Sequence, residues 1–167
     1  MTKANHIKSF DAKYRWLSNF FLTETKVCGI IFPSSENAYQ ALKVKDLPTR
    51  EYIATLSPSE AKRFSKTIKV RQNWDTLRVK AMWKVTVAKY SQNQELTKNL
   101  LQLSGFLIEE GNSWNDTFWG ICDGKGKNML GQIIMAYRDY RLGFVNRRVD
   151  SKIQKFVIAR MKNEFRI

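Results

Sequence analysis

Glu36, Gln40 and Lys43 are spaced so that a helix, which turns by about 100° per residue, would place all three along one stripe. A carboxylate, an amide and an amine would then face the same space, where a carboxylate can move protons and an amine can attack carbon or bind an anion. Tyr39 and Leu42 fall on the adjoining arc and can face a core. The spacing therefore predicts a polar site at the edge of a core, and a solvated Glu/Lys face on a surface helix is the alternative.

The chain of 167 residues, 43% of them hydrophobic, is long enough for one domain with a sizeable core, so we expect residues 1–167 to form a single domain. Its formal net charge of +14 and pI near 9.9 favour a polyanionic partner such as nucleic acid or a phosphorylated metabolite. The basic residues are dispersed among the expected structured segments, so a solvated basic surface is the alternative.

Cysteine and histidine are too scarce for several common kinds of site. Cys28 and Cys122 cannot form a disulfide framework, and His6 is the single histidine, which argues against histidine triads and multi-histidine metal sites. We therefore expect no metal and no cofactor. The first residues lack the apolar segment of a signal peptide and no apolar run has membrane-spanning length, so we expect a cytoplasmic protein with no membrane partner.

Sequence patterns predict a mostly helical α+β fold with a small sheet. Short strands are expected over 6–10 and 26–32, where β-branched and aromatic residues lie between polar or glycine positions. Ser57, Pro58 and Glu60 stand in capping-box order, which predicts a helix start there. The other helices are expected from 34 to a point before Pro48, from about 50, and over 74–90, 94–105, 129–140 and 151–166.

A second group of residues with possible chemistry lies between 115 and 128, where turn-forming residues lead into a helical pattern. Gly124 and Gly126 can let a backbone approach a ligand, and Lys125 and Lys127 add positive charge next to an expected helix N-terminus. This combination favours a phosphate or pyrophosphate. The segment matches neither a Walker A loop nor a dinucleotide fingerprint, and an ordinary turn capped by Asn128 is the alternative.

Several motifs, spread over roughly residues 8 to 141, resemble those of the NADAR (YbiA-like) family and follow the same order along the chain. They are Trp16-Leu17-Ser18-Asn19-Phe20, Phe32-Pro33-Ser34-Ser35-Glu36 continuing through Tyr39-Gln40-Ala41 to Lys43, Asn73-Trp74, and Phe118-Trp119-Gly120 continuing through Gly124-Lys125-Gly126-Lys127-Asn128 to Leu130-Gly131. The resemblance implies a YbiA-like fold and N-glycosidase activity. Some family members cleave ribosyl phosphate from pyrimidine intermediates of the riboflavin pathway, and others remove ADP-ribose from modified guanine in nucleic acid.

The resemblance also implies roles for individual residues. Glu36 and Lys43 match the catalytic glutamate and the motif lysine, and Trp74 matches a tryptophan that lines the substrate site. Asp116 and the segment Trp119, Gly120, Asp123, Gly124, Lys125, Gly126 and Asn128 correspond to the loop that would hold ribose and phosphate. Ile121 and Cys122 follow Trp-Gly where many relatives have an acid, which favours Asp116 over Asp123 as the functional carboxylate.

Three further assignments come from residue type. Arg15 and Asn19 are candidate contacts to phosphate or ribose, with structural roles as the alternative. Phe20 joins Trp74 and Trp119 as a candidate for stacking on a base, and Gln40 is a candidate substrate contact on the helical stripe; Trp83 is a weaker stacking candidate because it can be core.

The resemblance and these residues leave open two mechanisms and two substrates. Lys43 could attack the anomeric carbon and form an imine while Glu36 moves protons, or Glu36 could activate water while Lys43 binds phosphate or ribose hydroxyls. The high positive charge favours ADP-ribosylated guanine in nucleic acid over a pyrimidine riboside phosphate, and the loop 124–128 would then hold adenine and pyrophosphate. A noncatalytic module that binds ADP-ribose or nucleic acid is the alternative from another class.

Overall fold

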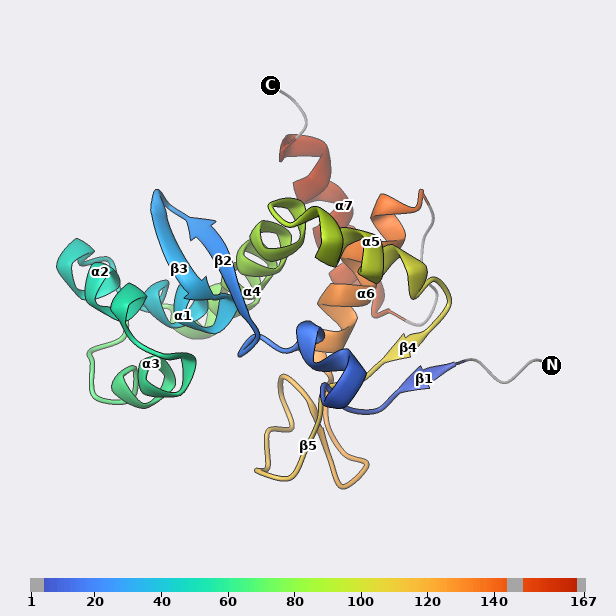
Figure 1. The fold of residues 1–167 in the computed structure, drawn as a ribbon, viewed down its shortest axis with the longest axis horizontal. Helices are drawn as coiled ribbons and strands as arrows, with labels where there is room; N and C mark the ends of the chain where they lie inside the picture. Colours follow the sequence, from blue (N-terminus) through green and yellow to red (C-terminus); the bar gives the residue numbers. More distant parts are fainter. Residues whose placement is uncertain (1–4, 144–148, 165–167) are drawn as a thin grey trace. The chain divides into compact units, whose positions relative to one another are not determined.

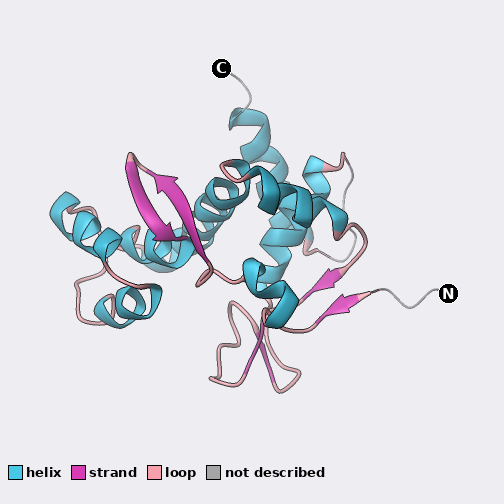
Figure 2. Cartoon of the chain, in the orientation of Figure 1, coloured by secondary structure: helices cyan, strands magenta, loops and turns pink. Residues whose placement is uncertain are grey.

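The structure, a computed structural model, describes residues 5–143 and 149–164, with side chains described as far as residue 159. Two compact units contain these residues: a middle unit, residues 16–96, and a terminal unit built from residues up to 15 and from 97 onward. Each unit is described by itself. Helices dominate both units and the sheets are small (Figure 2).

The middle unit contains one β-hairpin and four helices (Figure 1). Its elements are β2 (Leu22–Val27), β3 (Ile30–Ser34), α1 (Ser35–Ala41), α2 (Leu47–Thr55), α3 (Pro58–Phe64) and α4 (Trp74–Ser91). The strands are antiparallel, with a β-bulge between Leu22 and Thr25. Helix α1 contacts the hairpin and the other three helices, and its seven residues are all buried. The candidate catalytic helix is therefore the central element of this unit.

The terminal unit combines short parallel strand pairs with helices (Figure 1). Its elements are β1 (His6–Ile7), the 3-10 helix η1 (Ala12–Leu17), α5 (Gln94–Gln102), β4 (Leu107–Ile108), β5 (Gly111–Asn112), β6 (Ile121–Cys122), α6 (Met129–Arg141) and α7 (Ser151–Glu164); η1 and α5 each begin or end in the middle unit. Strand β1 pairs with β4, and β5 pairs with β6. Helix α6 supplies the largest share of the core of this unit, including Leu130, Ile133, Ile134 and Tyr137.

The predicted fold class is confirmed, and the helix starts at 58, 74, 94, 129 and 151 are correct. The capping box forms as predicted, with Ser57 Oγ accepting from Glu60 N–H and the Glu60 carboxylate accepting from Ser57 N–H. The single strand expected over 26–32 is wrong. Cys28 and Gly29 both have positive φ, 52° and 83°, and form the tight turn between β2 and β3. The other predicted strand, over 6–10, is shorter in the structure, where it covers only His6–Ile7.

Candidate functional site

Glu36 lies in the first turn of α1, with only 6% of its surface exposed. Ser34 caps this helix by accepting a hydrogen bond from Asn37 N–H. Gln40, one turn further on and 4% exposed, donates from Nε2 to Glu36 Oε1 over 2.6 Å. Sequence spacing correctly predicted that these two side chains share a face, and the structure adds that they are directly bonded and buried.

Gln40 also has an unused acceptor. Its Oε1 atom is buried and has no hydrogen-bond partner in the described part of the chain. A buried amide oxygen without a donor costs free energy, which a ligand hydroxyl or N–H group would recover. Gln40 can therefore hold Glu36 with one end of its amide and accept a hydrogen bond from substrate with the other.

Asn19 fixes the start of α1. Its backbone carbonyl accepts from Glu36 N–H over 2.9 Å, and its side-chain Oδ1 accepts from Ser35 Oγ over 3.0 Å. Its Nδ2 donates to Met82 Sδ over 3.2 Å. The backbone carbonyl and both polar atoms of the side chain thus have protein partners. The structure gives Asn19 a positioning role for Glu36, while direct contact with phosphate or ribose stays a prediction.

Lys89 supports the same turn, and sequence reasoning missed it. This α4 lysine is 1% exposed and donates from Nζ to the backbone oxygens of Leu17 and Ser18, over 3.3 Å and 2.8 Å. The turn that it holds leads directly to Asn19. No local pattern singles out a lysine that acts on a segment some seventy positions earlier in the chain.

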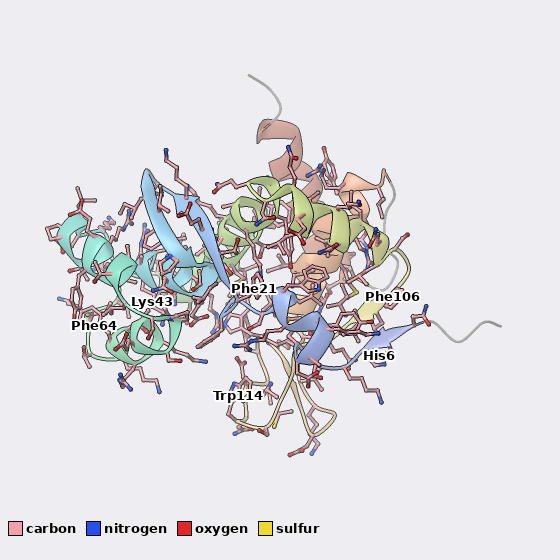
Figure 3. All side chains as sticks on the ribbon, viewed as in Figure 1. His6, Phe21, Lys43, Phe64, Phe106 and Trp114 are labelled. Atoms are coloured by element: carbon pink, nitrogen blue, oxygen red, sulfur yellow. The ribbon has the colours of Figure 1, made fainter. Side chains whose placement is uncertain are left out.

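Lys43 lies two residues beyond the end of α1, because this helix is shorter than the sequence predicted. Its N–H still donates to Gln40 O over 3.1 Å, so the last turn keeps Lys43 next to the helix. Figure 3 labels the Lys43 side chain, which is half-buried. It donates from Nζ to Ser65 Oγ over 3.3 Å, and Nζ lies 5.9 Å from the centroid of the Tyr39 ring.

Burial lowers the pKa of the Lys43 amine from its ordinary value of 10.5. The Glu36 carboxylate opposes this shift and raises the pKa, whereas the ammonium groups of Lys62 and Lys66 lower it further. Glu36 and Lys43 are therefore within electrostatic reach of each other, and the amine is easier to deprotonate than that of an exposed lysine. Such an amine can serve as a nucleophile or as a compact cation.

Trp74 and Phe20, both half-buried, place aromatic surface in the same unit. The Trp74 ring packs on Tyr39 at a centroid distance of 5.4 Å with an interplanar angle of 53°. Lys62 Nζ lies 5.3 Å from the centroid of Phe20. Trp83 is 2% exposed and is part of the core. Base stacking by Trp74 and Phe20 stays a prediction, and their half-buried rings keep surface available for it.

Asp116 organises the loop between β5 and β6 in the terminal unit. Its Oδ1 accepts from the N–H groups of Phe118 and Trp119, over 3.1 Å and 2.8 Å. Asn112 donates from Nδ2 to Asp116 O and accepts at Oδ1 from Asp116 N–H. Half-buried Trp119 packs edge-on against Phe118 at 4.8 Å. Asp116 thus builds the turn that presents these two rings, and a role for its carboxylate in binding ribose stays a prediction.

Asp123 and Gly124 form a two-residue turn at the tip of a narrow loop. Both have positive φ, 49° and 74°, and Cys122 and Lys125 on either side exchange two backbone hydrogen bonds of 2.9 Å. This geometry is typical of an Asp-Gly type I′ turn. Asp123, Gly124, Lys125 and Gly126 are all exposed. The loop therefore has a sufficient structural reason for its Asp-Gly pair, independent of any phosphate.

The predicted anion site at the N-terminus of α6 lacks its main donors. Met129 N–H and Leu130 N–H donate to the carbonyls of Phe118 and Trp119, over 3.1 Å and 3.0 Å. Asn128 precedes the helix but does not cap it: its side chain donates to Ile108 O and accepts from Glu110 N–H. These amides close the loop onto the helix, so binding of phosphate through 124–128 stays a prediction that would rest on lysine side chains.

Gly120 and Gly126 hold this loop together through close backbone contact. A Cβ atom on Gly120 would overlap the carbonyl oxygen of Glu110, and one on Gly126 would overlap the carbonyl oxygen of Gly120. Gly124 has open space around it. The first two glycines are therefore required for packing within the loop.

Arg15, at the end of η1, has an exposed side chain, and its contact with phosphate stays a prediction.

Within residues 5–143 and 149–159, no three His, Cys, Asp or Glu side chains are grouped to hold a metal ion. No helix over the described ranges has the length and apolar character needed to cross a membrane.

A buried carboxylate beside an amine of lowered pKa, on an α+β scaffold, defines a candidate site for acid–base or covalent catalysis. Comparison with known protein families identifies the family to which this chain belongs. The NADAR domain matches residues 6–140 of this chain, so the chain belongs to the NADAR domain family.

Sequence and structure comparisons with individual proteins are consistent with this membership. N-glycosidase YbiA of Escherichia coli is 36% identical over 130 residues, which are 75% of this chain and 81% of that protein. A riboflavin biosynthesis protein of Vibrio vulnificus is 34% identical over 133 residues, 77% of this chain and 36% of its own length. The NMR structure of Escherichia coli YbiA matches with a TM-score of 0.74 and 32% identity, over 88% of this chain and 93% of that one. The predicted resemblance to this family is confirmed.

Proposed function

We propose that this protein is an N-glycosidase that hydrolyses a base–ribose bond, and that its substrate is ADP-ribosylated guanine in nucleic acid. The observation that carries the proposal is that buried Glu36 lies within electrostatic reach of Lys43, an amine whose pKa is lowered by burial. Family membership adds support, since one of the relatives named above is called an N-glycosidase.

Cleavage of an N-glycosidic bond develops positive charge on the anomeric carbon and negative charge on the departing base. In the first mechanism, neutral Lys43 attacks the anomeric carbon, the bond to the base breaks, and the base leaves with the bonding electron pair and a proton delivered through Glu36. Ring opening then gives a protonated imine, and water releases the sugar and restores the lysine. The lowered pKa of Lys43 supports this mechanism because it raises the fraction of neutral amine.

In the second mechanism, Glu36 removes a proton from water, which attacks the anomeric carbon directly, while Lys43 binds phosphate or a ribose hydroxyl. Treatment with borohydride during turnover separates the two. The imine mechanism predicts a stable sugar adduct on Lys43, and absence of any adduct under turnover supports attack by water. Lys43→Arg should keep much of the activity only under the second mechanism.

The net charge of +14 supports the nucleic-acid substrate, because a broad positive field aids binding of a polyanion more than binding of a small metabolite. Activity on ADP-ribosylated DNA should then fall steeply between low and physiological salt. A flat salt response would favour a small substrate.

The names of two relatives favour a second candidate substrate, the pyrimidine riboside phosphates of riboflavin biosynthesis. The Vibrio protein and a Zea mays chloroplastic protein, 32% identical over 128 residues, are both called riboflavin biosynthesis proteins. A direct test incubates the protein with ADP-ribosylated guanine DNA and with the pyrimidine riboside phosphate side by side. The product that forms, ADP-ribose or ribose phosphate, identifies the substrate.

A noncatalytic reader of ADP-ribose or nucleic acid is the candidate from another class. An enzyme releases free base or ADP-ribose and loses this ability in Glu36→Gln while still binding its substrate. A reader releases nothing in either form.

The single domain expected for residues 1–167 also remains a proposal, which cooperative unfolding in one transition would support.

A further inference from the structure

Four basic residues of the middle unit lie around the end of α1: Lys43, Lys62, Lys66 and Arg71. Ser65 connects the first three. Its hydroxyl accepts from Lys43 Nζ over 3.3 Å and donates to Lys62 O over 2.9 Å, and Lys66 follows it directly in the chain. The electrostatic effect of Lys62 and Lys66 on Lys43 shows that their charges are close to its amine.

Arg71 joins this group through the backbone. Its N–H donates to Lys43 O over 2.8 Å, which ties the segment after α3 to the end of α1. The Arg71 Nε atom is shielded from solvent and has no hydrogen-bond partner in the described part of the chain. A buried guanidinium donor without an acceptor costs free energy, and a bound anion would supply the missing acceptor.

The carboxylates that α1 and α3 contribute both accept hydrogen bonds from protein donors. Glu60, on α3, accepts from Ser57 at the start of that helix, and Glu36 accepts from Gln40. Across the described residues, neither Lys66 nor Arg71 forms an ion pair with a carboxylate. Lys62 and Lys66 both disfavour the charged form of Lys43, so these like charges repel one another, and a bound anion would relieve this repulsion.

We infer that Lys62, Lys66 and Arg71 form, beside Lys43, a subsite for the phosphate on the 5′ carbon of the substrate ribose. This inference rests on the proposed function, and it holds for both candidate substrates, since the pyrimidine riboside carries a 5′-phosphate and ADP-ribose carries a pyrophosphate at the same carbon. For ADP-ribose it replaces the loop 124–128 as the expected site of the pyrophosphate. The guanidinium can bind phosphate with two parallel hydrogen bonds, and the lysines supply point charges. The ribose would then extend from this subsite toward Glu36 and Gln40.

The test compares substrates that differ only in the phosphate. The ratio of kcat/KM for the pyrimidine riboside 5′-phosphate to kcat/KM for the unphosphorylated riboside is measured for wild type, for Lys66→Gln with Arg71→Gln, and for Lys80→Gln with Lys84→Gln. Lys80 and Lys84 are exposed lysines of α4, so the second double variant loses the same two positive charges. We expect the ratio to fall roughly tenfold or more in the Lys66/Arg71 variant and to stay unchanged in the Lys80/Lys84 variant. A ratio unchanged in the Lys66/Arg71 variant, or lowered equally in the Lys80/Lys84 variant, overturns the subsite.

A second measurement needs no turnover, so it separates failure of the subsite from failure of the proposed function. Ribose 5-phosphate and ribose are titrated calorimetrically into wild type and into the Lys66/Arg71 variant, after the thermal transition shows that the variant is folded. We expect wild type to bind the phosphate ester at least tenfold more tightly than the Lys66/Arg71 variant does. Equal binding of ribose 5-phosphate by both proteins overturns the subsite even if the riboside is cleaved. If neither riboside is cleaved but this difference in binding appears, the glycosidase assignment fails and the phosphate site stands.

Discussion

Gln40 donates a hydrogen bond to the Glu36 carboxylate over 2.6 Å, and both side chains are buried on the same face of α1. A carboxylate in such surroundings is held in one orientation by its donor, which general acid–base catalysis requires. Seven-residue α1 is itself fixed by Ser34 at its cap and by the Asn19 carbonyl at Glu36 N–H. The position of Glu36 is therefore set by the packing of the whole middle unit.

Removing the donor of this pair should destabilise the protein. Gln40→Met keeps the approximate length of the side chain but removes the Nε2 donor from the buried Glu36 carboxylate. We expect the free energy of unfolding to fall by about 1.5–3 kcal/mol, the usual range for a hydrogen bond to a charged group. Urea denaturation measures this change. Gln94→Met, at an exposed position, is the control and should change stability by no more than about 0.5 kcal/mol. Equal stability of the two variants would show that the bond contributes nothing.

Lys43 should make the reaction depend on pH if it acts as the nucleophile. Only the neutral amine can attack carbon, so kcat/KM should rise with pH through the pKa of Lys43 and then reach a plateau. Because burial lowers this pKa below 10.5, the plateau should begin at a lower pH than for an exposed lysine. The complete pH–rate profile measures it. A profile that falls over this range would contradict the nucleophilic role and favour Lys43 as a binding cation.

Lys89→Met should loosen the segment that positions Glu36. The change leaves the Leu17 and Ser18 carbonyls without the donor that they share. We expect a loss of about 1–3 kcal/mol in the free energy of unfolding, the usual cost of buried polar groups left unsatisfied. Denaturant unfolding checks this, with exposed Lys84→Met as the control. Unchanged stability in Lys89→Met would mean that water replaces the ammonium group.

Two glycines of the terminal unit should differ sharply in their tolerance of a methyl group. In Gly120→Ala the new Cβ overlaps the backbone oxygen of Glu110, so the loop must shift, and we expect a cost of more than about 2 kcal/mol. Gly124 has φ +74° and free space, so Gly124→Ala should cost only the roughly 1 kcal/mol of a left-handed alanine. Thermal unfolding of both variants measures the difference. A larger loss for Gly124→Ala would contradict this account of the loop.

Local sequence signals predicted most of the helices and part of the site. The Ser57–Glu60 capping box and the stripe of Glu36 and Gln40 depend on residues three or four positions apart, so a sequence reveals them directly. The Asp123-Gly124 turn has an equally local signature of a tight hairpin, yet the glycines around it favoured a phosphate loop. The Cys28–Gly29 turn was missed because the flanking residues favour strand on both sides.

Long-range contacts set the rest. The contact of Arg71 N–H with Lys43 O, and that of Lys89 with Ser18 O, join segments distant in sequence, and no spacing rule predicts them. The use of the Met129 and Leu130 N–H groups depends on how a loop closes on α6, which also leaves no trace in the sequence.

The central claim is that Glu36 and Lys43 act together in cleaving a base–ribose bond. It is tested most directly by measuring release of free base from both candidate substrates by wild type and by Glu36→Gln, with binding of substrate measured in parallel. We predict release by wild type from at least one substrate, and a loss of roughly 10²- to 10⁴-fold in kcat for Glu36→Gln with binding retained. No release by wild type, or undiminished release by Glu36→Gln, would contradict the account.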